Sequence, residues 1–388
     1  MTETCDAVVI GAGCAGASIA FHLAERGLKV TLLEREVVAS GATGRSSGLV
    51  RMHYDLEAES RLAWASFAYF RNWRERIGGE SGFTRTGFLQ IESRARESLL
   101  RGNVAMHQRI GIPSLVVGAE DVKRLAPSFV TDDFDFAAYE PESGYADPVL
   151  TTNSFVAAAR ERGTRLVQEC EVTGIRLASG RVAGVSTTKG DFSAPVVVDA
   201  AGTRAASIGK MVGLDIPLTT WTHDVMHIRH PREIGFHPTV IDGALSFYFR
   251  PDTGNLTLVA LEDNNRLGEP PDAPLERVAA DFVERAVERI CRRIPGMDAG
   301  SLQSTHVGRD ALTPDQRAIL GRAGPEGFYL ACGFSGTGFK ISPAVGACIS
   351  ELIMDGKAST VDISPFTLAR FARGEHLKGE HDYGDIWH

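Results

Sequence analysis

The sequence predicts an α/β (α+β) fold in two parts, one built on a parallel sheet and one on a mixed or antiparallel sheet. Three observations predict it. A short apolar strand, a glycine-rich turn and an apolar helix open the chain. Similar apolar strands return near residues 197 and 330. The segment between them alternates aromatic and polar residues, as antiparallel strands do.

The composition is that of an ordinary globular protein of 388 residues, with 43% hydrophobic and 23% charged residues. The formal net charge of −8 disfavours DNA or RNA as a partner, because a polyanion needs a basic surface. No apolar run approaches the roughly 18–20 residues that span a bilayer, and the acidic start is not that of a secretory signal. Six scattered cysteines without a CxxC pair disfavour a disulfide scaffold and a zinc site. We therefore expect a soluble cytoplasmic protein with reduced thiols, no integral membrane segment and no metal.

The first elements form a βαβ unit. Residues 7–10 are apolar throughout, as in a buried parallel strand. Apolar residues then recur at helical spacing as far as Leu23, Gly27 closes the helix, and residues 30–33 give a second buried strand. Strand, helix and strand within about thirty residues are typical of this unit.

The later elements follow the same two periodicities. In chain order they are a helix at 62–77, a hairpin at 172–187, a buried strand at 196–198, antiparallel strands over 218–261, a helix at 275–294, and a strand at 328–331 followed by a helix to Met354. Because elements of the parallel type lie at both ends and near residue 200, we expect a discontinuous first domain of residues 1–80, 145–215 and 305–375. The second domain would comprise residues 81–144 and 216–304.

The turn after the first strand carries a dinucleotide-binding motif. Gly11, Gly13 and Gly16 form GxGxxG: the first permits the tight turn, the second lets a pyrophosphate approach the backbone, and the third lets helix and strand pack closely. Alone the motif is weak, because such a turn is often purely structural. Here Glu34 ends the next strand, 18 residues after Gly16, where a carboxylate can accept ribose hydroxyls. Arg35 beside it leaves a phosphorylated ribose as a minor alternative.

Two further segments favour FAD over NAD. Residues 40–51, SGATGRSSGLVR, follow the second strand and can wrap a larger cofactor, although a flexible surface loop would have the same composition. The strand at 196–198 runs into Ala200, Ala201 and Gly202, a second glycine-containing strand end near the first. Together they predict a Rossmann-like FAD-binding domain beside a substrate domain.

The segment from Gly333 to Lys340 gives the most specific functional indication in the sequence. Its glycines open a helix, so that free backbone N–H groups and the positive helix end face whatever lies above. A reduced flavin gains negative charge on its pyrimidine side, and such a helix end would stabilise it. Lys340 would then lie near the ring; the alternative from spacing alone is a solvated lysine.

On these residues the chain resembles the FAD-dependent D-amino acid oxidase (DAO) superfamily, in the branch of monomeric sarcosine oxidase and glycine oxidase. The matching stretches run along nearly the whole chain: VVIGAGCAGASIAFHLAERGLKVTLLE, SSGLVRMHY, SGYADP, VVVDAAG, YFRPDTGNLTLV, LTPDQRAILG and GFYLACGFSGTGFKISPAVG. The resemblance implies an oxidoreductase with FAD as cofactor and an amino acid or amine as substrate.

The resemblance also implies site residues. In the sarcosine oxidase branch an arginine of an RxxY segment and the lysine of GFSGxGFK clamp the substrate carboxylate, and Arg51 and Lys340 occupy these positions. Tyr248 and Arg250 would line the substrate pocket, with core packing nearly as good an interpretation. The residues expected to contact FAD are Gly11, Gly13, Ala15, Gly16, Glu34, Arg35, Thr43, Ser46, Ser47, Gly48, Val172, Ala200, Gly202, Gly308, Gly333, Gly336, Thr337, Gly338, Phe339 and Lys340.

Three departures from the family pattern matter. Gly308 occupies the region of the cysteine that attaches flavin in monomeric sarcosine oxidases, so we expect non-covalent FAD. No lysine stands near Thr257, where those enzymes carry one that activates oxygen, so a quinone or another electron carrier competes with oxygen as the acceptor. Arg204 replaces the aromatic residue after the middle strand, with a consequence that the sequence leaves open. Cys332 is expected to be a buried small hydrophobe.

The histidines receive no metal-binding interpretation. His223, His227, His230 and His237 lack a metal-ligand spacing. His53, between Arg51 and Tyr54, is a candidate for contact with the flavin, and His381 and His388 are expected to be solvated. We predict FAD-dependent oxidation of a carboxylate-bearing amine such as sarcosine, an N-methyl amino acid or proline. Two alternatives stay open: a 2-hydroxy acid or glycerol-phosphate dehydrogenase, and a flavoprotein subunit of an amine-oxidising complex. The oligomeric state is also open.

Overall fold

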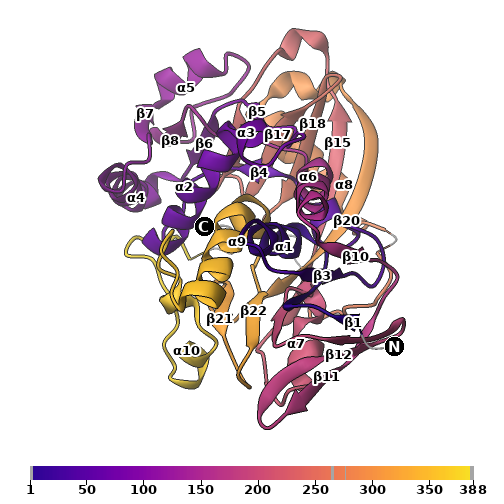
Figure 1. Ribbon diagram of the computed structural model, residues 1–388. Coiled ribbons are helices and arrows are strands. Elements are labelled where there is room, and N and C mark those ends of the chain that lie inside the picture. The colour runs from indigo at the N-terminus through magenta and orange to yellow at the C-terminus, as the bar shows by residue number, and fades with distance from the viewer. Residues whose placement is uncertain (1–2, 264–265, 276, 385–388) are drawn as a thin grey trace.

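The computed structural model describes residues 3–263, 266–275 and 277–384. Two large sheets form its two ends, the smaller one low in Figure 1 and the larger one high, with helices α1, α2 and α9 between them. The described part of the chain contains no helix both long and apolar enough to cross a membrane. The six cysteines are all free thiols, and Cys332 is fully buried among apolar side chains, as expected.

The six-stranded sheet carries the predicted βαβ unit. Its strand order is β10 (Arg165–Val167), β3 (Val30–Leu33), β2 (Ala7–Ile10), β14 (Val196–Asp199), β22 (Phe328–Cys332) and β21 (Ile319–Arg322). All neighbours are parallel except the pair β21 and β22. Both faces of β2 are covered, which explains why its four residues are all apolar: Ala7 and Val9 pack with the helices, Val8 and Ile10 with the opposite layer.

The layers on the two faces differ. Helices α1 (Cys14–Glu25), α6 (Pro148–Glu161) and α9 (Gly338–Asp355) contribute to the apolar core on one face. The other face packs on α7 (Ala205–Lys210) and on a four-stranded sheet, in the order β1 (Glu3–Thr4), β13 (Gly190–Ser193), β12 (Arg181–Thr187) and β11 (Val172–Ala178). The predicted hairpin at 172–187 is therefore confirmed as β11 and β12.

The larger sheet contains the antiparallel strands expected over 218–261. Its order is β19 (Arg266–Leu267), β15 (Thr219–Arg229), β18 (Leu256–Leu261), β17 (Phe247–Asp252), β16 (Thr239–Asp242), β6 (Phe88–Ile91), β8 (Phe136–Glu140) and β7 (Leu115–Gly118), and β20 (Ser301–Leu312) also pairs with β15. Alternate residues face opposite ways: Phe247 and Phe249 pack toward α8 (Phe282–Arg293), while Tyr248 packs with Phe88 and Leu258 on the other face. The second face looks toward the helices and holds the site.

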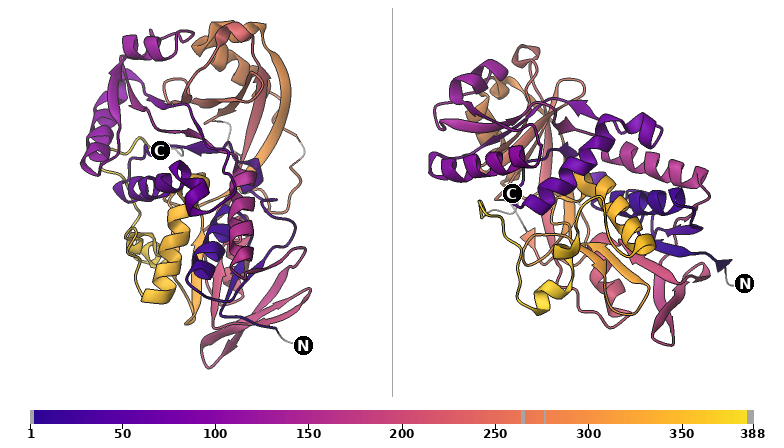
Figure 2. Two further views of the ribbon diagram at one scale, coloured as in Figure 1. Left: turned by 45° about the horizontal axis from the view of Figure 1, so that its top comes forward. Right: turned by 60° about the vertical axis from the view of Figure 1, so that its left-hand side comes forward.

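A small three-stranded sheet links the two ends. It joins β4 (Leu49–Val50), β9 (Gly144–Tyr145) and β5 (Thr84–Arg85), so that the residues directly after β4 are held between the large sheet and the helices. Helix α4 (Glu97–Arg109) lies beside β8 at one flank. The yellow C-terminal segment returns to this flank in both views of Figure 2, and Asn103 of α4 donates a hydrogen bond of 3.0 Å to the His381 carbonyl.

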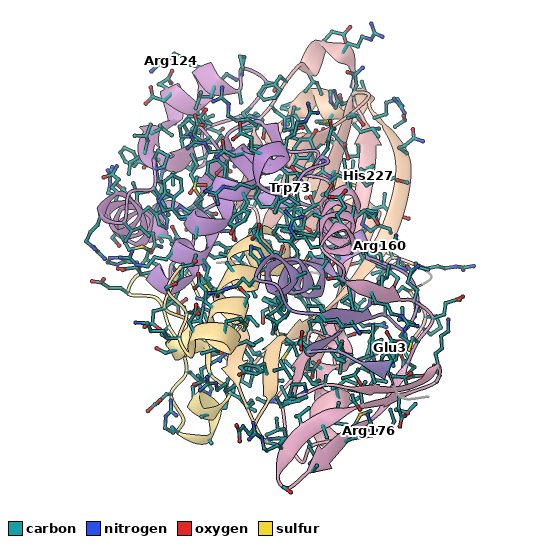
Figure 3. The ribbon with its side chains drawn as sticks, viewed as in Figure 1. Glu3, Trp73, Arg124, Arg160, Arg176 and His227 are labelled. Carbon is teal, nitrogen blue, oxygen red and sulfur yellow. The ribbon has the colours of Figure 1, made fainter. Side chains whose placement is uncertain are left out.

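Two predicted helices have different bounds. The helix expected at 62–77 consists of α2 (Glu57–Arg71) and α3 (Trp73–Arg76), which begins at the Trp73 labelled in Figure 3. The Trp73 ring packs edge-on against Phe155 of α6, with ring centroids 4.9 Å apart. The helix expected from 275 begins only at Phe282, and residue 276 lies outside the described residues. Val278 packs on the same core as α8 without being helical, and the Ala279 N–H donates to the Asp224 carboxylate at 2.9 Å. Apolar spacing alone therefore placed the helix start too early.

The division into domains remains our proposal. The two sheets agree with a discontinuous first domain and an inserted second one. Strand β20 pairs with β15 from Ser301 to Leu312 and so runs through the boundary expected at 305. A boundary at the end of β20 keeps the whole strand with its sheet.

Candidate active site

A cavity of about 580 Å³ runs between segments that are distant in the sequence. This volume lies within the range of small-molecule sites. The predicted cofactor residues that line it are Gly11, Gly13, Ala15, Glu34, Arg35, Thr43, Ser46, Val172, Ala200, Gly202, Gly333, Gly336, Gly338 and Phe339. Gly16, Ser47, Gly48, Gly308, Thr337 and Lys340 are not among its lining residues.

The start of α1 forms one end of the cavity. Gly11 has φ +101°, and a Cβ there would lie 2.5 Å from the Ala200 carbonyl oxygen. At Gly16 a Cβ would lie 1.9 Å from the Gly11 oxygen, so this residue serves helix–strand packing and not direct contact. The Cys14 N–H donates to Thr43 Oγ1 at 3.1 Å, which ties the loop at residue 43 to the helix N-terminus. The turn is therefore shaped for a ligand phosphate at the positive end of a buried helix.

Glu34 is fixed at the same end. Its two carboxylate oxygens accept hydrogen bonds of 2.8 Å from the Ala12 and Glu36 N–H groups. Arg35 lies 3.5 Å from Asp272, and Arg204, which also lines the cavity, pairs with the same carboxylate. The position of Arg204, left open by the sequence, is thus in an ion-paired group at the cavity wall.

The start of α9 forms the other end. Gly333 has φ +64°, and a Cβ there would approach Thr313 Cγ2 to 2.6 Å. The Ser335 N–H donates to the Ala311 oxygen of β20 at 3.0 Å, which holds the glycine loop against the larger sheet. Gly336, Gly338 and Phe339 then line the cavity at the N-terminus of an 18-residue helix. This helix end can stabilise negative charge on a bound ring.

These features fit FAD. The volume suits a large ligand, the α1 turn offers backbone N–H groups to a pyrophosphate, Glu34 offers a carboxylate to a ribose, and α9 presents a positive helix end. The residues that would hold it come from both ends of the chain and from the region near residue 200. The cofactor site is thus assembled from distant segments, as the sequence predicts.

Arg51 and Lys340 come together next to this cavity. Neither is among the residues that line it, but Lys340 directly follows Phe339, which does. Arg51 follows β4 and Lys340 lies in the first turn of α9. The Arg51 guanidinium carbon lies 4.3 Å from the centroid of the Tyr54 ring, and Lys340 Nζ lies 5.7 Å from the same centroid. The two cations are therefore at most about 10 Å apart, the sum of these distances. They are 3% and 8% exposed.

Burial and mutual repulsion both disfavour the positive charge of Lys340. Burial first, and Arg51 second, hold the pKa of Lys340 well below its ordinary value, while Glu59 and Asp310 oppose that shift. Glu59 is completely buried and accepts a 2.9 Å ion pair from Arg317, which also pairs with Asp55 at 2.6 Å. Glu59 and Asp310 therefore offset part of the Lys340 charge. An anion bound between Arg51 and Lys340 would be attracted by both cations and would relieve their mutual repulsion.

Tyr248 and Arg250 lie near this region but are not among the residues that line the cavity. Arg250 donates from Nε to the Ser47 carbonyl at 2.5 Å, pairs with Asp252 at 3.2 Å, and stacks 4.3 Å over the Tyr145 ring. Tyr248 is 2% exposed, and burial raises the pKa of its phenol to about 12. These contacts fasten residues 46–48, so Arg250 is better placed to position that loop than to bind substrate.

Strand β20 adds residues that the sequence did not single out. Its register pairs Trp221 with Asp310 and His223 with Gly308, so that Asp310 and His223 share one face of the sheet. Asp310 lines the cavity, and burial raises its pKa. A Cβ at Gly308 would lie 2.6 Å from His223 Nε2, so the imidazole occupies the space of a side chain at that position. Only the strand's alternation could have indicated Asp310 beforehand.

The structure also shows which way Thr257 faces, the position near which the sequence lacks an oxygen-activating lysine. Thr257 faces away from the site, toward the α8 core, and its hydroxyl lies 2.9 Å from His237 Nε2. Leu258 and Ala260 of β18 face the site instead. Both side chains are apolar, so neither brings a positive charge to the face of β18 that lies toward the site.

The remaining histidines are mostly buried. His53 is 1% exposed, lies 3.0 Å from the Tyr383 hydroxyl and is not among the cavity-lining residues. His223, His230 and His237 are buried as well. The expectation of a solvated His381 is wrong in part, since its ring covers Gly102, and His388 lies outside the described residues.

Fold and cavity together define a Rossmann-like dinucleotide-binding protein with a second, strand-rich part. Residues 6–352 match the family described as FAD dependent oxidoreductase, DAO, so the chain belongs to that family. The family is one of FAD-dependent oxidoreductases, and FAD is its cofactor.

Named relatives agree with this assignment. Human mitochondrial sarcosine dehydrogenase is 30% identical over 386 residues, which are 96% of this chain and 42% of that protein. The chain thus spans less than half of that relative. Sarcosine oxidase subunit beta of Arthrobacter sp is 26% identical over 396 residues, 99% of this chain and 95% of that one. The crystal structure of L-proline dehydrogenase from P. horikoshii has 27% identity and a TM-score of 0.91, covering 97% of this chain and 100% of that one.

Proposed function

We propose that this protein oxidises the C–N bond of a small carboxylate-bearing amine to an imine. The substrate class is sarcosine, another N-methyl amino acid, proline or a related α-amino acid. The single observation that carries the proposal is the pair of buried cations, Arg51 and Lys340, on one tyrosine ring beside the FAD cavity. The substrates in the names of the sarcosine and proline dehydrogenases are consistent with it.

In this mechanism the two cations neutralise and orient the substrate carboxylate. A guanidinium can grip both carboxylate oxygens, and an ammonium adds a point charge from a second direction. Tyr54, whose fully buried ring lies close to both cations, gives the carboxylate site a rigid wall. Fixed orientation turns the substrate C–H toward the cofactor and removes part of the entropic cost of reaction.

The same charges act on the substrate amine. Nearby positive charges disfavour an ammonium group, so they promote loss of its proton and leave the nitrogen lone pair that forms the C=N bond. FAD, when bound, supplies the acceptor for the hydride that leaves the carbon. Water then hydrolyses the imine to a carbonyl compound and an amine.

We further propose that the acceptor of the electrons is a quinone or another carrier in preference to oxygen. The support is the apolar site face of β18, where Leu258 and Ala260 lie, so that this strand offers no cation to developing superoxide. The names of the two dehydrogenase relatives point the same way.

One observation favours a second candidate. The chain matches sarcosine oxidase subunit beta along nearly the full length of both. This favours a flavoprotein subunit of an amine-oxidising complex, which would copurify with partners and turn over slowly alone.

The test is anaerobic mixing of the purified yellow protein with a panel of amino acids, N-methyl amino acids, proline and the matching 2-hydroxy acids. We expect the flavin to bleach with one or more amines and not with the hydroxy acids. Bleaching by the hydroxy acids alone would contradict the proposal. The rate of recovery in air, compared with recovery by a quinone, then separates the two acceptors, and slow turnover with fast bleaching indicates a missing partner.

A further inference from the structure

A buried group of metal-ligand type lies outside the cavity. His53 follows β4, His107 lies in α4, and Glu140 ends β8. One ring nitrogen of each histidine and one carboxylate oxygen lie within 4.8 Å of one another. The three side chains are 1%, 0% and 0% exposed. None of them is among the residues that line the FAD cavity, so the cluster is separate from the cofactor site.

The hydrogen bonds of His107 leave a nitrogen lone pair available. Its Nε2 lies 2.8 Å from the Tyr54 carbonyl oxygen and 3.4 Å from the Tyr54 nitrogen. The shorter contact decides the tautomer: a carbonyl can only accept, so Nε2 carries the hydrogen. Nδ1 is then an acceptor, and it has no hydrogen-bond partner among residues 3–263, 266–275 and 277–384.

Glu140 is arranged in the same way. Its Oε2 accepts hydrogen bonds from the Met52 N–H at 2.9 Å and the Ser143 hydroxyl at 2.7 Å. Its Oε1 is buried and, in the described part of the chain, has no hydrogen-bond partner. Two acceptors without a donor therefore lie in one buried cluster, and such groups are costly unless a donor or a cation satisfies them.

The other hydrogen bonds of these side chains follow the pattern that metal-binding side chains show. A ligating histidine commonly donates its second ring N–H to a backbone carbonyl, and a ligating carboxylate is itself held by hydrogen bonds. His107 and Glu140 both follow this pattern. His53 contributes the third ligand-type atom of the cluster, and its Nε2 lies 3.0 Å from the Tyr383 hydroxyl.

We propose that His53, His107 and Glu140 bind one Zn²⁺ ion, with Nδ1 of His107 and Oε1 of Glu140 among the donors. Two imidazoles and one carboxylate suit zinc better than calcium or magnesium, which prefer oxygen ligands. Ligands on opposite sides of zinc lie at most roughly 4.2 Å apart, and the three donor atoms lie within 4.8 Å of one another, so binding needs inward movement of at most some tenths of an ångström to reach that separation.

One charged neighbour opposes the ion. Arg51 acts electrostatically on both His107 and Glu140, so the binding is weaker than three such ligands would give alone. The ion would join α4 and β8 to the segment 51–54, which carries Arg51 and Tyr54. Its expected role is therefore structural: it holds the carboxylate-binding residues in place and takes no part in the oxidation itself.

The test measures metal in the full-length holoprotein after dialysis against zinc and passage over a chelating resin. Elemental analysis should give one zinc per chain in the wild type and a loss of at least tenfold in both His107→Gln and Glu140→Gln. The matched controls are His376→Gln and Glu142→Gln, at exposed and half-exposed positions, which should keep the ion. Added zinc should also raise the melting temperature of metal-free wild type but not of the two variants, since a ligand specific to the folded state stabilises it.

Two results overturn the proposal. If the wild type holds no zinc after loading, a buried water or a proton on Glu140 satisfies the two acceptors, Nδ1 of His107 and Oε1 of Glu140. Zinc retained in both cluster variants means an adventitious surface site. If a variant fails to fold, the wild-type zinc content and melting shift still decide. None of these readouts depends on catalysis, so they stand apart from the proposed amine oxidation.

Discussion

Replacing Lys340 by methionine tests the carboxylate clamp with little change of shape. Methionine keeps an unbranched apolar stem in place of the lysine stem and removes only the ammonium group. Lys340 is 8% exposed, and its Nζ lies 5.7 Å from the centroid of the Tyr54 ring that Arg51 also contacts, so its charge acts in a largely desolvated setting. We expect Lys340→Met to weaken carboxylate binding strongly while FAD stays bound.

The magnitude follows from Coulomb's law and from measured ion pairs. At a contact of about 4 Å and an effective dielectric constant of about 20, one charge pair is worth about 4 kcal/mol. Loss of one partner in a desolvated pair costs about 2–5 kcal/mol. At 1.4 kcal/mol per tenfold, the dissociation constant should rise roughly 30-fold to several thousand-fold.

The free protein should respond in the opposite direction. Burial and Arg51 both disfavour the Lys340 charge, so its removal relieves a cost in the absence of ligand. The melting temperature of Lys340→Met without ligand should therefore equal or exceed that of the wild type. Weaker binding with unchanged or higher stability distinguishes a lost contact from a damaged fold.

The assay is a titration with an unreactive carboxylate such as acetate, followed by the change in the flavin absorption spectrum. Lys357→Met, at an exposed position, is the control for a lost lysine charge. A dissociation constant of Lys340→Met within twofold of the wild-type value would refute the reasoning, and so would equal loss in the Lys357 variant.

The remaining predictions concern pH, the phosphate turn and the cofactor bond. Because burial and a neighbouring guanidinium lower the pKa of Lys340, its charge is present at low pH and is lost as pH rises through that lowered value. Above the pKa of acetate itself, the dissociation constant for acetate should thus be flat up to the lowered pKa of Lys340 and increase beyond it, and this increase should be absent in Lys340→Met. Gly16→Ala places a Cβ 1.9 Å from the Gly11 oxygen, so it should yield protein depleted in FAD, measured as the flavin-to-protein absorbance ratio, whereas Gly174→Ala, with only a 4.0 Å contact, should retain FAD. With glycine at 308 and His223 filling the space of a side chain there, acid precipitation should release all flavin to the supernatant; flavin that remains with the pellet would contradict non-covalent binding.

The cofactor half of the molecule could be predicted because its sequence signals are local. The strand at 7–10, the glycine turn and Glu34 lie within one βαβ unit, and each residue type has a single physical reason to be there. The loop from Gly333 could also be predicted from the sequence, since glycines before an apolar helix indicate a backbone that must approach a ligand.

The site residues that the larger sheet contributes could not be predicted in the same way. Asp310 reaches the cavity only because β20 pairs with β15 in one register, and that register is set by contacts far apart in the chain. The position of Thr257 shows the same limit: a shift by one residue exchanges the site face and the core face of a strand. Helix α8 began late because the apolar Val278 packs on the core from a non-helical segment.

The histidine cluster was missed for a related reason. Positions 53, 107 and 140 share no short spacing, so a search for metal motifs along the sequence cannot connect them. Only the packing of α4 and β8 against the segment after β4 brings them together.

The most direct measurement is a crystal structure of the FAD-loaded protein with an unreactive carboxylate bound. The account predicts one ligand whose carboxylate oxygens lie within hydrogen-bond distance of both the Arg51 guanidinium and Lys340 Nζ, with its other end facing the flavin ring. A carboxylate bound elsewhere, while these two side chains keep their places on Tyr54 without an anion between them, would contradict it.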